Sequence, residues 1–532
     1  MKRKWYALVL VFVLTLSMAL VGCSKSESTG SDSKEGEKQE GGNKQDTLVF
    51  GRGGDTVSLD PATATDGESF KVTKNLFNTL IEFGEQDTEL NPGLAKEWSV
   101  SEDGLTYTLK LQEGIKFHDG TDFNAEAVVF NFNRWKAGNK EQFYYYNSQF
   151  GDVIQEVKAV DPATVEFKLS RPLAPFFKNL AMSPFAISSP AAVEKYGEKY
   201  NENPVGTGAF KFKEWKRNDR IVIEKNEEFW IDGLPKLNQV IFKVIPENSA
   251  RLNALKTGEV DLIDGVNFTD VPGIESDSNL QTFFRPSLNV AYLGLTSTRG
   301  PLKDKKVRQA LNHAVDKKAL VEAFFAGEAT PAINPMPEVV EGYNDSIEDY
   351  PFDLEKAKQL LAEAGYADGF EMELWAMPVP RPYMPDGQKV AEALQANFAK
   401  IGVKAKIVTY EWATYLDKAR AGEADSFLLG WTGDNGDADN FLYVLLDKDS
   451  IGSNNYTYYQ NDQVHDLLIQ AQTEVDPAKR NELYKKAQEI IKDDAPWVPL
   501  VHSKPALAGK ANITGFKAHP TGSDELGTVE FQ

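Results

Sequence analysis

Three short segments in the second half of the chain decide the fold: FEMELWA (370–376), VKAKIVTY (403–410) and SFLLGW (426–431). Each reads as a strand, and helical periodicity fills the intervals at about 387–400 and 413–420. Alternation of strands and helices indicates a largely parallel sheet that is covered by helices. The sequence therefore predicts an α/β fold for this half of the chain.

The flanking regions extend this interpretation. Asp304, Asp353 and Asp476 each precede a helical segment and can cap it, and the first of these helices is predicted to run to about Phe325. The residues after Pro505 return to strand-like patterning, so we expect the C-terminus to cross back to the first half. That half has an α+β pattern, with predicted strands at 47–51, 105–111, 210–215, 221–224 and 240–245.

The composition excludes several classes of protein. A chain of 532 residues exceeds the usual size of one core, and its net charge of -21 opposes nonspecific binding to nucleic acid. One Cys rules out an intrachain disulfide and a CxxC metal site. The five His form no HExxH motif, and the chain contains no GxSxG, GxGxxG or phosphate-binding loop. We therefore predict no catalytic residue, no metal and no cofactor, although paired acids alone do not exclude a glycosidase.

The N-terminus predicts export. Three basic residues precede an apolar stretch that ends in LVGC (20–23), so residues 1–22 are read as a signal peptide. LVGC resembles the bacterial lipobox, in which the cysteine, here Cys23, is acylated. The alternatives are a retained membrane anchor and an ordinary buried thiol. Residues 23–46 lack apolar side chains after Cys23 and are predicted to form a flexible, lipid-anchored tether on the extracytoplasmic side of the cell membrane.

Polar and aromatic side chains follow the three predicted strands that decide the fold. Arg381 and Tyr383 lie in a proline-rich loop after the first strand, Trp412 follows the second, and Asp434 follows the third. Ligands of open α/β sheets bind beyond the carboxyl ends of the strands, which makes these loops candidates for a binding site. The alternatives are a solvated Arg381, and a surface turn or calcium loop at 434–439.

Longer stretches resemble a known family. GLAKEWSVSEDGLTYTLKLQEGIKFHDGTDFNAEAVVFNFNRW (93–135), NPVGTGAFKFKEW (203–215) and PLKDKKVRQALNHAVDK (301–317) resemble the large extracytoplasmic solute-binding proteins of peptide and nickel ABC importers. LWAMPVPRPYMP (374–385), AKIVTYEWATYL (405–416) and GWTGDNGDADNF (430–441) resemble the dipeptide-binding branch of that family. The resemblance runs from about residue 47 to the C-terminus.

The resemblance implies a two-lobed periplasmic-binding-protein-like fold with a hinge and an inserted third subdomain. Lobe I would comprise residues 47–77, 204–286 and 505–532, the inserted subdomain residues 78–203, and lobe II residues 287–504. Two lobes joined by a hinge enclose their ligand on closing.

The resemblance also implies the binding residues. Asp434 would pair with the α-ammonium of a dipeptide and Arg381 with its α-carboxylate, and two opposite buried charges select for ligand length. The other implied ligand-binding residues are Tyr383, Trp412, Trp431, Thr432 and Gly433, with Asp66, Gly67, Glu68 and Ser69 on the opposing lobe.

The implied function is that of a lipid-anchored, monomeric receptor that delivers dipeptides to an ABC permease. Within the same fold, the ligand could instead be a longer oligopeptide, a peptide signal, haem or chelated nickel. A secreted hydrolase and a signalling receptor without transport are alternatives from other classes.

Overall fold

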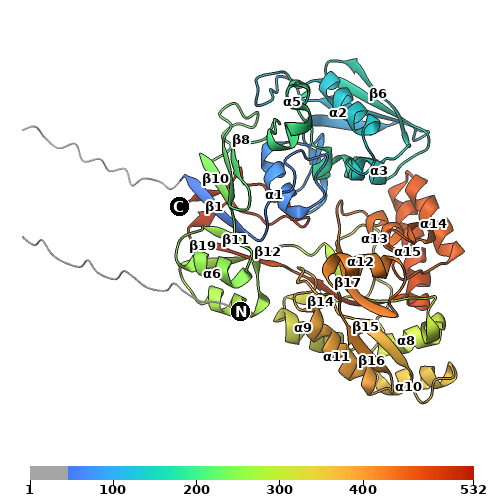
Figure 1. Cartoon of the computed structure of the whole chain (residues 1–532). Helices are drawn as coiled ribbons and strands as arrows, with labels where there is room; N and C mark the ends of the chain where they lie inside the picture. Colours follow the sequence, from blue (N-terminus) through green and yellow to red (C-terminus); the bar gives the residue numbers. More distant parts are fainter. Residues whose placement is uncertain (1–45) are drawn as a thin grey trace, which may run out of the picture. The chain divides into compact units, whose positions relative to one another are not determined.

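The structure, a computed structural model, describes residues 46–532 (Figure 1). The predicted signal peptide, Cys23 and the tether up to residue 45 lie outside the described residues. No helix in residues 46–532 combines the length and the apolar character needed to cross a bilayer. The described chain is mixed α/β and is built around three large sheets.

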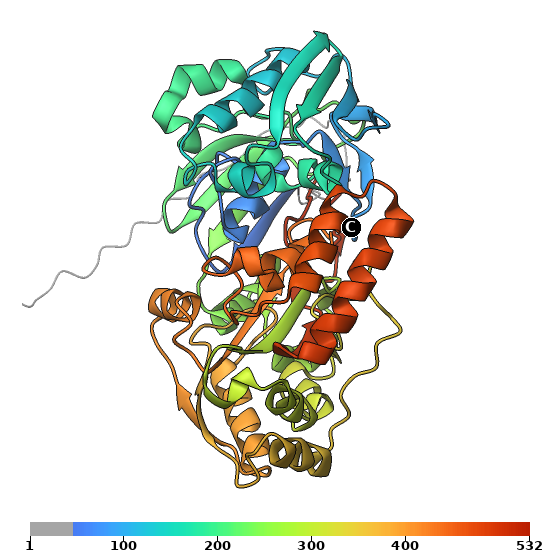
Figure 2. The same ribbon diagram turned by 90° about the vertical axis from the view of Figure 1, so that its right-hand side faces the viewer.

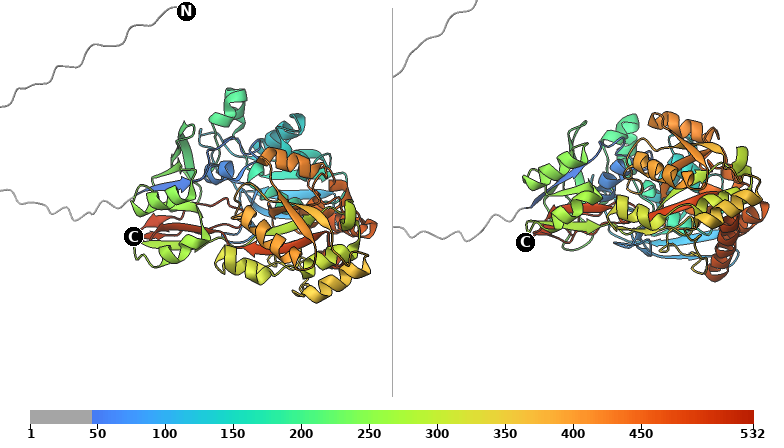
Figure 3. Two further views of the ribbon diagram at one scale, coloured as in Figure 1. Left: turned by 60° about the horizontal axis from the view of Figure 1, so that its bottom comes forward. Right: turned by 90° about the horizontal axis from the view of Figure 1, so that it is seen from below.

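The first sheet contains seven strands from distant parts of the chain, in the order β12-β19-β11-β1-β10-β9-β8. Figure 3 shows its blue, green and red strands side by side. Strand β19 pairs with β11 and β12, so the C-terminus returns to the first half of the chain as predicted. The strands are β1 (Thr47–Arg52), β8 (Phe210–Lys216), β9 (Arg220–Lys225), β10 (Gln239–Val244), β11 (Leu262–Val266), β12 (Leu280–Phe284) and β19 (Ala506–Lys510).

The second sheet has six strands in the order β14-β18-β13-β17-β15-β16. Only β15 pairs in parallel, with β16 and β17, and the other pairs are antiparallel. The three strands on which the prediction of a parallel sheet rests, β15, β16 and β17, do pair in parallel. The sheet as a whole is mixed, because β13, β14 and β18 add antiparallel pairs that the strand–helix alternation did not predict. The strands are β13 (Asn289–Leu295), β14 (Ala329–Pro331), β15 (Glu371–Trp375), β16 (Lys404–Val408), β17 (Ser426–Thr432) and β18 (Trp497–Ser503).

The third sheet has four antiparallel strands in the order β4-β5-β7-β6. Its core is aromatic: Phe132 lies against Trp135 and Phe167, with ring centroids 4.6 and 4.8 Å apart. The elements of this region are β4 (Ala95–Val100), β5 (Thr106–Leu111), β6 (Ile154–Asp161), β7 (Thr164–Leu169), α2 (Ala125–Ala137), α3 (Tyr144–Gln149), α4 (Phe176–Leu180) and α5 (Pro190–Tyr196).

Most predicted helices are present. Asp353 and Asp476 cap α10 and α15, as their positions predict. The predicted helix over 304–325 is instead two helices, because Asp316 accepts a hydrogen bond from the Ala319 amide and caps a new helix. Helices α14 and α15 pack against each other (Figure 2). The helices are α1 (Gly67–Leu76), α6 (Asn248–Lys256), α7 (Val271–Glu275), α8 (Lys305–His313), α9 (Lys317–Phe325), α10 (Leu354–Glu363), α11 (Gly387–Ala399), α12 (Trp412–Arg420), α13 (Asp439–Leu446), α14 (Asp462–Thr473) and α15 (Pro477–Asp494).

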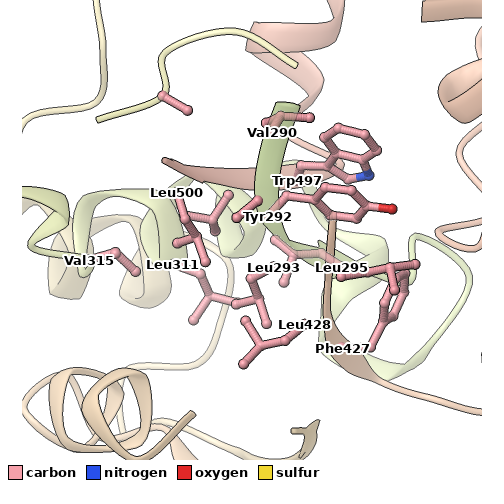
Figure 4. Packing of buried hydrophobic residues seen from close by; sticks show 14 of the residues in the cluster. Val290, Tyr292, Leu293, Leu295, Leu311, Val315, Phe427, Leu428, Trp497 and Leu500 are labelled. Carbon is pink, nitrogen blue, oxygen red and sulfur yellow. The ribbon is translucent and has the colours of Figure 1, made fainter. Parts of the chain in front are cut away.

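Strand β13 is the centre of the largest apolar core (Figure 4). All seven of its residues are buried. Tyr292 stacks on Trp497 of β18 with ring centroids 3.6 Å apart, while Leu293 is fully buried beside Leu311 and Leu428. The core therefore fixes the strand that carries the chain into the second sheet.

The chain passes between the first and second sheets twice, at residues 285–288 and at 504–505. The two crossings lie side by side, because the Arg285 amide donates a hydrogen bond to the Pro505 carbonyl at 2.9 Å. The Arg285 guanidinium also forms a buried ion pair with Asp524 at 2.7 Å.

The Leu293→Ala substitution should lower the free energy of unfolding by about 2–5 kcal/mol, because it removes a fully buried side chain and leaves a cavity. Denaturant unfolding measures the change. Val339→Ala is the control: this side chain is 66% exposed, so the expected change is within about 0.5 kcal/mol. Equal effects of the two substitutions would contradict the assigned core.

Candidate functional site

A cavity of about 800 Å³ brings distant parts of the chain together. Two of its walls are the loops that follow β15 and β17. Other walls come from α1, from the C-terminal segment and from the region of the four-stranded sheet. The main segments of the wall are residues 66–68, 181–184, 264–268, 380–382, 432–434 and 519–523.

Asp434 is the second residue after β17 and is held in a fixed orientation. Asn440 of α13 accepts a hydrogen bond from the Asp434 amide at 3.0 Å and donates one to the Asp434 carboxylate at 3.2 Å. The Tyr145 hydroxyl donates to the same carboxylate from α3, at 3.4 Å. Burial raises the pKa of the Asp434 carboxyl to about 6, against the lowering effect of these two side-chain hydrogen bonds. The carboxylate is thus oriented but incompletely stabilised.

Arg381 lies in a tight turn after β15. Its amide and carbonyl form reciprocal hydrogen bonds with those of Met384, each 2.9 Å long. Its guanidinium carbon is 5.1 Å from the centroid of the Trp412 ring, within the range of a cation–π contact. The side chain is exposed, so the expectation of two buried charges fails for Arg381: the turn projects it from the sheet over Trp412.

The other charged side chains of the cavity wall are mostly paired. Basic side chains with carboxylate partners are Lys71 (Glu68 and Asp264), Lys74 (Glu82 and Glu525), Arg251 (Asp264), Arg285 (Asp524) and Lys517 (Glu85). Within residues 46–532, neither Arg381 nor Asp434 has an oppositely charged partner within 4 Å. Asp66 also lacks one, but its carboxylate caps α1. Arg381 and Asp434 are therefore the two charges of the wall that are available to a ligand.

The opposing predicted loop is at the N-terminus of α1. Asp66, Gly67 and Glu68 line the cavity. Ser69 does not, because its buried hydroxyl accepts hydrogen bonds from the Val57 and Ser58 amides and donates one to Asp66 at 2.7 Å. The Ser69 hydroxyl thus holds the loop at residues 66–68 in place without lining the cavity.

The predicted walls divide into two groups. Thr432 and Gly433 line the cavity, whereas Tyr383, Trp412 and Trp431 are not part of its wall. Trp431 donates its indole N–H to Asn440 at 2.9 Å. Tyr383 packs so closely on Gly430 of β17 that a Cβ there would be 2.3 Å from its ring. These three aromatics support the charged side chains rather than forming the wall.

Tyr145 and Asn289 are among the lining residues that were not predicted. Tyr145 comes from a segment with three consecutive tyrosines, and Asn289 is the first residue of β13. Position relative to a strand end could have indicated Asn289. Nothing in the local sequence connects Tyr145 with Asp434, which is 289 residues away.

In the loop at 434–439, for which calcium binding was an alternative interpretation, Asp437 and Asp439 have protein partners. Arg480 donates two hydrogen bonds of 2.7 Å to Asp437, and Gln472 donates to Asp439 at 3.0 Å. Burial, and then the nearby Asp437 charge, raise the pKa of Asp439 to about 7. Elsewhere, Asp447, Asp449 and His465 gather at the start of α14 and offer oxygen and nitrogen atoms, with His465 hydrogen-bonded to Asp447 at 3.0 Å.

Two sheets joined by two adjacent crossings, with a charged cavity walled by loops from both, define a two-lobed solute-binding protein. The chain belongs to the bacterial extracellular solute-binding proteins, family 5, whose middle region matches residues 89–453. Members of this family bind solutes and are not enzymes, so the chain is a solute-binding protein.

Several relatives are similar along nearly their whole length. The chain is 39% identical to the dipeptide-binding protein of Escherichia coli, covering 91% of this chain and 95% of that one. It is 37% identical to the heme-binding protein A of Haemophilus influenzae, covering 96% and 97%. The solved structure of the periplasmic binding protein DppA from Helicobacter pylori in complex with peptide STSA is 34% identical, with a TM-score of 0.79 over 92% of this chain and 98% of that one.

The Gly430→Ala substitution should destabilise the protein by about 1–3 kcal/mol, because the added methyl would meet the Tyr383 ring at 2.3 Å and the Val290 carbonyl at 2.6 Å. Gly273→Ala is the matched control, since no atom lies within 4 Å of its added methyl. Thermal unfolding of both variants measures the difference. If Gly430→Ala melts like the control, Tyr383 is not held against β17.

Proposed function

We propose that the protein is a lipid-anchored receptor that captures dipeptides and delivers them to an ABC transporter for uptake. One observation carries the proposal: Arg381 and Asp434 are the charged side chains of the cavity wall that have neither a charged partner nor a capping role. A dipeptide zwitterion supplies the two complementary charges at its ends.

Electrostatics supports the assignment of each end. Asp434 is desolvated and its carboxylate accepts hydrogen bonds from neutral groups alone, so an α-ammonium stabilises it more than water does. Arg381 presents a planar set of donors that suits the two oxygens of an α-carboxylate. Side chains of the ligand would occupy the remainder of the cavity, whose own charges are already paired. The site would therefore recognise the ends of the ligand rather than its side chains.

The remaining features of the proposal concern delivery. Acylated Cys23 would attach the protein to the outer face of the cell membrane, and the polar tether would leave the folded part free to move above it. The receptor would act as a monomer and present its loaded form to a membrane permease.

Haem and longer peptides form the second candidate class of ligand. The heme-binding protein A of Haemophilus influenzae is 37% identical, and the related Helicobacter pylori structure contains the peptide STSA. A cavity of about 800 Å³ is at the upper end of the range for small-molecule sites and exceeds the need of most dipeptides. The presence of one unpaired positive charge, Arg381, and one unpaired negative charge, Asp434, favours a zwitterionic ligand over haem.

The Arg381→Ala substitution should weaken dipeptide binding about 30-fold or more, because it leaves the ligand carboxylate without its charged partner. Calorimetry with a free dipeptide, an N-acetylated dipeptide and a C-amidated dipeptide measures the change. Arg220→Ala on β9, which is not part of the cavity wall, serves as the control and should bind normally. Tight binding of haem with no binding of dipeptides or longer peptides would favour the second class.

Dipeptide affinity should fall about tenfold per pH unit well below pH 6 and become constant above pH 7, because only the ionised Asp434 carboxylate attracts an ammonium. Since burial raises the pKa of Asp434 to about 6, the protonated form accumulates as the pH falls through that value. Asp434→Asn should bind weakly, with no change in affinity between pH 5 and 7, in calorimetric titrations.

Asp439 provides the control for this titration, since its pKa is also raised, to about 7. The Asp439→Asn variant should keep the pH dependence of the unmodified protein. Persistence of the pH dependence in Asp434→Asn would assign it to another group.

A further inference from the structure

We propose that Ser503 is a positioning residue for Arg381, which it holds in place by attaching the Arg381 turn to the chain crossing. The inference rests on the proposed function and deepens it, because it names a group that sets the geometry of the ligand's carboxylate site. Ser503 is the last residue of β18, is fully buried, and immediately precedes the second crossing.

The contact is a hydrogen bond to the centre of the turn. The Ser503 hydroxyl is 2.9 Å from the Pro382 carbonyl, the residue directly after Arg381. It is also 3.1 Å from the Asn289 side-chain oxygen. The Asn289 oxygen also accepts the Ser503 amide proton at 3.1 Å. The Pro382 carbonyl is the closer of the two acceptors of the hydroxyl, and Ser503 is the partner that ties this carbonyl to the second sheet.

The backbone of the turn is rigid, so a displacement of Pro382 also displaces Arg381. Proline on both sides of Arg381 restricts the backbone, and the reciprocal hydrogen bonds with Met384 close the turn. The Trp412 ring contacts the guanidinium at the other end of the Arg381 side chain. The hydrogen bond from Ser503 of β18 to Pro382 therefore fixes the position of the Arg381 turn relative to the second sheet.

The same pair of crossings also anchors the second ligand charge. The Asn289 side chain donates to the Ser503 carbonyl at 3.0 Å, which joins the two crossings. One residue earlier, the Leu288 carbonyl accepts the Gly433 amide at 2.7 Å, directly before Asp434. Residues 288, 289 and 503 thus connect the turn of Arg381 and the loop of Asp434 through one small hydrogen-bonded unit.

The test is calorimetry of the full-length protein with a free dipeptide and with its C-amidated form. The Ser503→Ala variant should bind the free dipeptide about tenfold more weakly, since it loses one buried hydrogen bond. It should bind the amidated dipeptide as the unmodified protein does, because that ligand does not use the charge of Arg381. Ser503→Thr keeps the hydroxyl and should restore binding.

Ser426→Ala is the matched control. Ser426 is a buried serine of the same sheet whose hydroxyl donates to a backbone carbonyl, that of Glu373 at 2.9 Å, outside the cavity wall. Its loss should lower the melting temperature about as much as Ser503→Ala does, without a change in affinity. The double variant Ser503→Ala/Arg381→Ala should bind no more weakly than Arg381→Ala alone.

Equal weakening of both ligands by Ser503→Ala, or an unchanged affinity for the free dipeptide, would overturn the positioning role. If Arg381→Ala weakens binding and Ser503→Ala does not, this inference fails and the proposed function stands. If the unmodified protein binds no dipeptide, the proposed function fails and this assignment fails with it.

Discussion

The two adjacent chain crossings are the constraint on which the site depends. Buried backbone groups need hydrogen-bond partners, and here the chain leaves one sheet and enters another at two neighbouring points. The Arg285 amide pairs with the Pro505 carbonyl, and the Asn289 side chain pairs with both the amide and the carbonyl of Ser503. Each crossing supplies hydrogen-bond partners for polar groups of the other, so neither crossing can move without breaking these hydrogen bonds. Both charge-bearing loops are attached beside this unit.

Although the chain is strongly acidic, most charged side chains of the cavity wall form ion pairs with side chains of opposite charge. Lys71 lies between Glu68 and Asp264, and Lys74 between Glu82 and Glu525. Such pairs add little net stability, but they leave the wall without a strong field of either sign. Recognition then depends on the few groups that remain unmatched. This arrangement suits a receptor that must tolerate different side chains on a common zwitterionic frame.

The sequence predicted local elements better than their assembly. Helix caps such as Asp353 and the loops after β15 and β17 could be read from spacing, and the residues of those loops do reach one cavity. The antiparallel pairing of β13 with β17 and β18 could not be predicted in this way. The directions of β13 and β18 depend on how the chain passes between the two sheets, which local spacing does not show. Tyr383 was expected in the wall, yet its contact with Gly430 depends on a neighbouring strand. Tyr145 reaches Asp434 only through the tertiary fold.

The position of β19 has a consequence for the order of folding. This strand comes from the last 27 residues of the 532-residue chain, yet it lies inside the seven-stranded sheet, between β12 and β11. Without it, β12 would have no partner in that sheet. The sheet therefore cannot be completed until β19 has been synthesised, and the contacts that close it span more than 200 residues. Such non-local closure is slow, and it leaves the growing chain incompletely folded until β19 joins the sheet.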